Sequence, residues 1–176
     1  MRVWLIIVVV VLGLSGVGVL LLRSYNHRHA FNAATRTYAT LQDAMEAGVI
    51  KQGWLPDFLP RSARDIREKH NYEENRVIAC FSFDPSEKML RMLSEAIEVA
   101  DDRIEGMRPP AAIGEEEPWF RREITQGEFR ALTRAGFRFY SMERNETLGP
   151  HQVIATWYFA VNQKAGLAYL WLLAKG

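Results

Sequence analysis

The sequence has very little cysteine and almost no net charge. Cys80 is the single cysteine among 176 residues, so no internal disulfide can form and the folded part must be stabilised by its hydrophobic core. Lysine and arginine number 22 against 21 aspartate and glutamate residues, which leaves a formal net charge of +1. So small an excess gives no strongly basic surface of the kind that binds nucleic acids. We therefore expect no nucleic-acid partner.

The common motifs of catalysis and cofactor binding are also missing. The sequence contains no Gly-x-Ser-x-Gly motif, no phosphate-binding loop, no dinucleotide-binding fingerprint and no Cys-x-x-Cys pair. His70, Glu73 and His151 are the residues that would suit a metal-dependent or acid–base hydrolase, but they lack the i, i+4 spacing of a helical zinc motif. The sequence thus predicts no catalytic residues, no metal ligands and no cofactor, and a hydrolase that uses these three residues is the alternative.

The chain begins with a long apolar run. No charged residue occurs between Val3 and Leu22, and at about 1.5 Å per residue the run measures about 30 Å, the thickness of the hydrocarbon core of a bilayer. A cleaved signal peptide has a shorter apolar region and a small-x-small cleavage site, whereas this run continues to Arg23. We predict an uncleaved transmembrane anchor over residues 1–23 that contacts the membrane through residues 3–22. A cleaved signal is the alternative.

The remaining sequence predicts a short linker and one domain. Residues 24–34 contain few large apolar side chains and indicate a juxtamembrane linker, and residues 35–176 have the length of one soluble domain. Arg23, Arg28 and Arg36 follow the apolar run and slightly favour a cytoplasmic domain by the positive-inside rule. The very short tail before the run permits either orientation.

Apolar periodicity predicts helices in two places. Spacings of three and four indicate an amphipathic helix over residues 35–50 and a long helix from Pro85 to Ile104 that opens with Asp84 as its N-cap. Prolines between residues 53 and 71 exclude a continuous helix there and predict an ordered loop.

Alternation of apolar and polar residues predicts four strands. They cover residues 76–83, 137–143, 152–161 and 166–173. The last two strands are joined by a hairpin loop that ends at Gly166, where a positive φ is expected. We therefore predict an α+β fold in which a small four-stranded antiparallel sheet packs against the one long helix.

Residues 53–66 form an unusual motif, Gly-Trp-Leu-Pro-x-Phe-Leu-Pro-x-Ser-Ala-x-Asp-Ile. This motif, with the segment from His70 to Asn75 and the turn from Asn162 to Tyr169, resembles a loose set of small bacterial envelope proteins of unassigned function. Members of the set look like lipoproteins or membrane-anchored domains. The resemblance implies a protein of the bacterial inner membrane with its soluble domain in the periplasm. It supplies no catalytic residues, and here an apolar anchor replaces the lipid-bearing cysteine.

Two loops braced by proline contain the residues best suited to binding, because proline lowers the entropy cost of ordering a loop. The candidates are Trp54, Asp57 and Phe58 in the first loop and Trp119 in the acidic loop that ends at residue 120. The other interpretation is that Trp54 and Phe58 pack against the sheet and that Asp57 caps the local backbone. We expect a single-pass, membrane-anchored envelope domain that serves as a non-catalytic binding or interaction module, with an envelope protein as a candidate partner.

Overall fold

The computed structural model describes residues 35–71, 75–87, 89, 96–99, 104–109, 117–148 and 151–174. The chain divides into two units, Met1–Ala34 and Thr35–Gly176, and all of the described residues belong to the second unit. Its elements, in chain order, are β1 (Arg36–Thr40), α2 (Leu41–Glu46), β2 (Arg64–Asn71), β3 (Arg76–Ser82), β4 (Ile97–Glu98), the 3₁₀ helix η1 (Ile104–Met107), α5 (Arg122–Gln126), α6 (Phe129–Arg134), β5 (Arg138–Leu148), β6 (His151–Asn162) and β7 (Leu167–Ala174).

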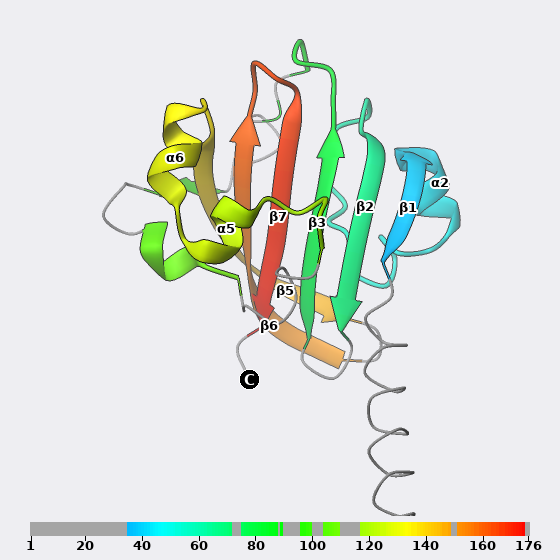
Figure 1. Cartoon of the computed structure of the whole chain (residues 1–176). Helices are drawn as coiled ribbons and strands as arrows, with labels where there is room; N and C mark the ends of the chain where they lie inside the picture. Colours follow the sequence, from blue (N-terminus) through cyan, green and yellow to red (C-terminus); the bar gives the residue numbers. More distant parts are fainter. Residues whose placement is uncertain are drawn as a thin grey trace, which may run out of the picture. The chain divides into compact units, whose positions relative to one another are not determined.

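The strands form one antiparallel sheet in the order β1-β2-β3-β7-β6-β5-β4 (Figure 1). Strand β7 lies at the centre, where it pairs with β3 from Arg76↔Leu173 to Ser82↔Leu167 and with β6 on its other side. Strands β1, β2 and β3 thus lie on one side of β7, and strands β6, β5 and β4 lie on the other. In each group, strands that are consecutive in the chain are neighbours in the sheet.

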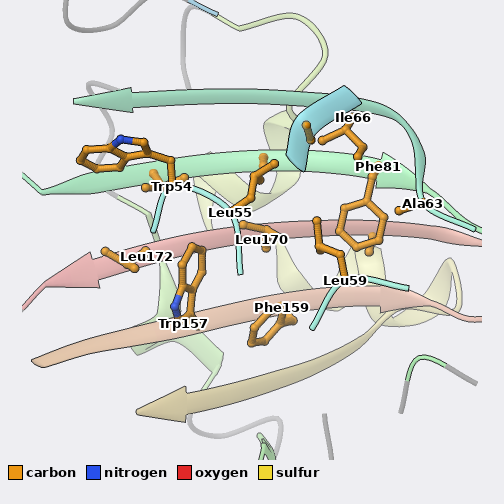
Figure 2. Close-up of a cluster of buried hydrophobic side chains, with 14 of the residues drawn as sticks. Trp54, Leu55, Leu59, Ala63, Ile66, Phe81, Trp157, Phe159, Leu170 and Leu172 are labelled. Carbon is orange, nitrogen blue, oxygen red and sulfur yellow. The ribbon is translucent and has the colours of Figure 1, made fainter. Parts of the chain in front are cut away.

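Both faces of the sheet centre are buried, because side chains that point alternately to the two faces are covered by other segments on each side. On the first face, Phe81, Trp157 and Leu170 are covered by residues 41–63, which we call the covering segment (Figure 2). On the second face, a separate cluster that includes Tyr169 and Trp171 packs against η1, α5 and α6. Burial on both faces explains why β7 is an almost continuous apolar run instead of an alternating one.

The covering segment starts with a well-capped helix. The Thr40 hydroxyl accepts a hydrogen bond from the backbone N–H of Asp43 at 3.2 Å, and the Asp43 carboxylate accepts one from the Thr40 N–H at 2.9 Å. This capping box fixes the start of α2 at Leu41 and leaves Thr40 extended in β1. The helix predicted over residues 35–50 is therefore a strand followed by a helix of six residues.

The predicted α+β fold with four strands and one long helix is wrong. The four strands are present, but β1, β2 and β4 enlarge the sheet to seven strands, and α2, α5 and α6 have only five or six residues each. In the region of the predicted long helix, β4 pairs with β5 and the Val99 N–H donates to the Phe139 carbonyl at 2.9 Å. Pairing with β5 outweighs the local helical periodicity there.

The transmembrane helix predicted for residues 3–22 lies outside the described residues. Within the part of the chain that the structure describes, no helix is long and apolar enough to cross a membrane. The elements that the structure describes are those of a sheet with short helices.

Candidate functional site

Trp54 lies in the core and not on a presenting loop. Its side chain is fully buried between the covering segment, to which it belongs, and the sheet, and its indole stacks on the His70 ring with centroids 4.3 Å apart and planes 9° apart. Trp54 was predicted as a binding residue and His70 as a residue of the alternative hydrolase site, and the structure brings the two rings into contact. Its location favours a packing role for Trp54, as in the alternative interpretation of the motif.

Asp57 and Phe58 close the covering segment over the sheet. The exposed Asp57 carboxylate accepts a hydrogen bond from Arg144 Nη1 at 3.0 Å, and the Arg144 guanidinium lies 5.5 Å from the centre of the Phe58 ring. The half-buried Phe58 also contacts Phe159 edge to face at 5.7 Å. An ion pair this exposed contributes about 0–1 kcal/mol, so the aromatic packing provides most of the attachment.

A buried polar cluster, which we call the Glu68 cluster, lies beneath Trp54. The Glu68 carboxylate has 0% exposure, and its Oε2 is 2.8 Å from His70 Nδ1. The Tyr38 hydroxyl donates to Glu68 Oε1 at 3.4 Å, and Arg36 Nε lies 4.0 Å from the same oxygen. Burial, together with the negative charge of Glu68, raises the pKa of Tyr38, so this hydroxyl stays a neutral donor.

Of the predicted hydrolase residues, only the His70 side chain lies among the described residues, where it belongs to the Glu68 cluster. A carboxylate bonded to a histidine suits acid–base chemistry, but both groups are buried and His70 is covered by Trp54. Glu73 and the His151 side chain lie outside the described residues. Among the described residues, no three histidine, cysteine, aspartate or glutamate side chains gather to hold a metal ion.

Trp119 belongs to a polar cluster on the second face. Glu117 accepts hydrogen bonds from Lys69 Nζ at 2.8 Å, from the Thr35 hydroxyl at 2.9 Å and from the Trp119 indole N–H. Burial raises the pKa of Glu117, but the hydrogen bonds from Lys69 and Thr35 outweigh it and hold the pKa below its usual value. The carboxylate is thus ionised and fixes the half-buried Trp119 side chain at the start of α5.

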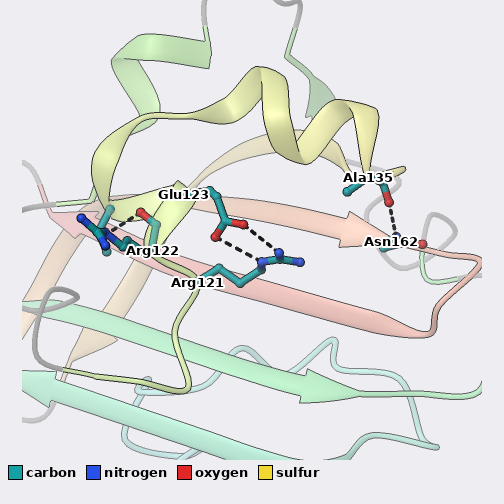
Figure 3. A network of polar contacts seen from close by, with 6 residues as sticks. Arg121, Arg122, Glu123, Ala135 and Asn162 are labelled. Atoms are coloured by element: carbon teal, nitrogen blue, oxygen red, sulfur yellow. Dashed lines mark hydrogen bonds and ion pairs between the residues drawn. The ribbon is translucent and has the colours of Figure 1, made fainter.

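A cleft of about 700 Å³, which we call the Trp119 cleft, opens beside these residues. Its described lining comprises Glu117, Pro118, Trp119, Phe120, Arg121, Arg122, Glu123, Thr125, Gln126 and Tyr169. Arg121 and Glu123 face each other across a 2.7 Å ion pair (Figure 3). The ring of Trp119 meets that of Phe120 edge to face at 5.9 Å, which gives the cleft an aromatic wall beside charged groups.

Tyr169 is a largely buried residue whose side chain lines this cleft. The residue is 7% exposed, and burial raises its pKa to about 12. Its ring packs edge to face against Phe120, while its hydroxyl makes no hydrogen bond within the described part of the chain. A neutral O–H group thus lies at a cleft wall without a hydrogen-bond partner among the described residues.

Comparison with known protein families shows a similarity in the first part of the described chain. Residues 32–82 are similar to the YbbD head domain. This small bacterial domain family covers less than a third of the chain, so the match describes a segment and not the whole protein. No curated protein and no solved structure matches the chain.

The segment similar to the YbbD head domain comprises β1, α2, the covering segment, β2 and β3. It therefore contains the Glu68 cluster and Trp54, whereas every described residue that lines the Trp119 cleft lies beyond it. The similarity accordingly concerns β1, β2 and β3 of the sheet. It does not include the described lining of the cleft.

Sequence reasoning found Trp119 but missed Arg121, Glu123 and Tyr169. Tyr169 and Trp171 are two residues apart in β7 and lie on the same face of the sheet. However, α5 and Tyr169 are separated by more than forty residues, and no local pattern indicates that they meet. The run of aromatic and charged residues directly after Pro118 was the one signal available.

Proposed function

We propose that this chain is a non-catalytic binding module that holds its ligand or partner in the Trp119 cleft. The observation that carries the proposal is the cleft itself, about 700 Å³ in volume, where an aromatic wall and unused polar groups meet. Binding sites for small ligands are commonly clefts of about 300–1,000 Å³ that combine apolar surface with a few oriented polar groups.

The walls of the Trp119 cleft are held in place before any ligand arrives. Glu117 fixes Trp119 from one side, and the Arg121–Glu123 ion pair holds the side chains at the start of α5. Pre-ordered side chains lower the entropy cost of binding. The same groups offer no nucleophile beside a general base, which favours binding over catalysis.

Fluorine NMR on the full-length chain labelled with 5-fluorotryptophan tests this proposal. The chain contains five tryptophans, and the Trp119 resonance is assigned by its loss in Trp119→Phe. We expect members of a small library of aromatic acids, amides and sugars to shift the Trp119 resonance while the resonances of the buried Trp157 and Trp171 stay unchanged. A library that leaves the Trp119 resonance unmoved at millimolar concentration would overturn the proposal.

A further inference from the structure

The described lining of the Trp119 cleft contains hydrogen-bond donors that no described residue uses. Arg121 donates to Glu123 through Nε and Nη2, and no hydrogen bond between described residues uses its Nη1. The Tyr169 hydroxyl, in a side chain more than nine-tenths buried, is likewise uncommitted within that part of the chain. Both oxygens of Glu123 accept a hydrogen bond from Arg121, so the negative charge of Glu123 is already paired within the protein.

The charges at the cleft favour an anion. Arg121 is matched by Glu123, and Glu117 is matched by Lys69, whose Nζ lies 2.8 Å from the carboxylate. Arg122 also lines the cleft and is exposed, and no ion pair among the described residues involves it. Among the described residues, one cation is therefore in excess, next to the Tyr169 hydroxyl, whose pKa is raised to about 12 by burial so that it stays a neutral donor at physiological pH.

We infer that the Trp119 cleft binds the anionic oxygen group, carboxylate or phosphate, of a ligand whose flat apolar part lies against Trp119. This inference rests on the proposed binding function and names the chemistry of its ligand. The Tyr169 hydroxyl and the guanidinium groups of Arg121 and Arg122 donate to the anionic oxygens. Hydrogen bonds to a charged group are about twice as strong as those between neutral groups, so the anion supplies most of the specificity.

Three probes with the same phenyl ring separate the contributions. They are N-acetyl-L-phenylalanine, its uncharged primary amide and phenyl phosphate, each titrated against the fluorine resonance of Trp119 in the full-length chain. We expect at least one of the two anions to bind about ten-fold more tightly than the amide, as the loss of a charge-assisted hydrogen bond implies. The tighter of the two anions identifies the group as carboxylate or phosphate.

Two variants locate the donors. Tyr169→Phe keeps the ring that packs on Phe120 and removes only the hydroxyl, and Arg122→Gln removes the excess cation. Each is expected to weaken binding of the preferred anion by about five- to ten-fold and to leave amide binding unchanged. Arg130→Gln removes the same charge from the exposed side of α6, outside the described cleft lining, and controls for a general electrostatic effect.

The outcomes distinguish this inference from the proposed function. If the amide binds as tightly as both anions, or if Tyr169→Phe and Arg122→Gln change nothing, the anion inference is overturned while the cleft remains a binding site. If none of the three probes shifts the Trp119 resonance and the wider library is also silent, the binding function fails with it. A loss of binding in Arg130→Gln equal to that in Arg122→Gln would also count against a specific site.

Discussion

Gly53 shows how a single residue fixes the covering segment on the sheet. Its φ is 77°, a left-handed conformation that side chains disfavour, and a Cβ built there would lie 2.0 Å from the Thr147 carbonyl oxygen of β5. The residue directly before Trp54 therefore touches the backbone at the far end of another strand. Glycine satisfies both the backbone conformation and the close approach.

The substitution Gly53→Ala is expected to lower the free energy of unfolding by roughly 2–5 kcal/mol, from the left-handed backbone and the overpacking together. The matched control is Gly106→Ala in η1, where an added Cβ meets nothing within 4 Å. We expect the control to stay within about 0.5 kcal/mol of the wild type. Urea unfolding followed by tryptophan fluorescence measures both variants, and equal stability of the two would contradict this account of Gly53.

Glu87 binds the C-terminal end of the covering segment. The Glu87 carboxylate accepts hydrogen bonds from the Arg61 N–H at 2.8 Å, from the Ser62 N–H at 3.0 Å and from the Ser62 hydroxyl. The sequence placed this residue in the first turn of a long helix, next to Asp84. In the structure its side chain instead joins the segment after β3 to the residues that lead into β2.

These contacts make part of the stability dependent on pH. The Ser62 hydroxyl, followed by the two backbone N–H groups, lowers the pKa of Glu87 below its ordinary value of 4.5. A carboxyl with a lowered folded-state pKa stabilises the fold fully above the unfolded-state pKa, and this contribution disappears as the pH falls through the folded-state value. Protonation would remove the charge that strengthens all three hydrogen bonds.

We therefore expect Glu87→Gln to be destabilising at pH 7 and nearly neutral relative to wild type at pH 3. The measurement is the difference in free energy of unfolding between the two proteins across this range. Glu46→Gln provides the baseline, because Glu46 is exposed and accepts a hydrogen bond only from the Gln42 side chain among the described residues. A difference for Glu87→Gln that is constant with pH would show that charge has no part in the attachment.

At the scale of the whole molecule, the sheet joins the segment similar to the YbbD head domain to the rest of the chain. Strand β3 ends that segment, and all seven of its residues pair with β7. The core of the first face likewise contains residues from both parts, since Phe81 and Ile66 belong to the same cluster as Trp157 and Leu172 (Figure 2). The matched segment therefore completes its core with strands from outside the match.

The periplasmic location of the domain stays a prediction, because it rests on the resemblance of the sequence motif. Reporters fused after Gly176 test it in a bacterial host: alkaline phosphatase is active only after export, and green fluorescent protein is expected to fluoresce only in the cytoplasm. We expect phosphatase activity without fluorescence. Fluorescence without phosphatase activity would place the domain in the cytoplasm and exclude an envelope role.

The four strands with regular apolar patterns could be predicted from the sequence, as could the hairpin turn at Gly166. Their alternation is local, and Gly166 adopts the expected positive φ of 61°. The Thr40–Asp43 capping box was also readable, although it was passed over in favour of a longer helix. These features depend on residues that are close along the chain, so they can be recognised in the sequence without knowledge of tertiary contacts.

Strand β2 could not be predicted, because its burial depends on contacts from elsewhere. Glu68, Lys69 and His70 are buried in succession, which breaks any apolar pattern. They are tolerated because Tyr38 bonds to Glu68, Trp54 stacks on His70 and Glu117 pairs with Lys69. Each partner comes from a different part of the chain.

The sequence by itself determined which segments alternate, where prolines and glycines turn the chain, and that no familiar catalytic motif is present. Tertiary structure alone decided that Ile97 and Glu98 pair with β5 and that the charged residues near the end of β2 are buried. It also decided that Tyr169 and α5 line the same cleft. The physical reason is the range of the interactions. Periodicity and capping act over a few residues, whereas strand pairing and the pairing of buried charges act between residues that only the fold brings together.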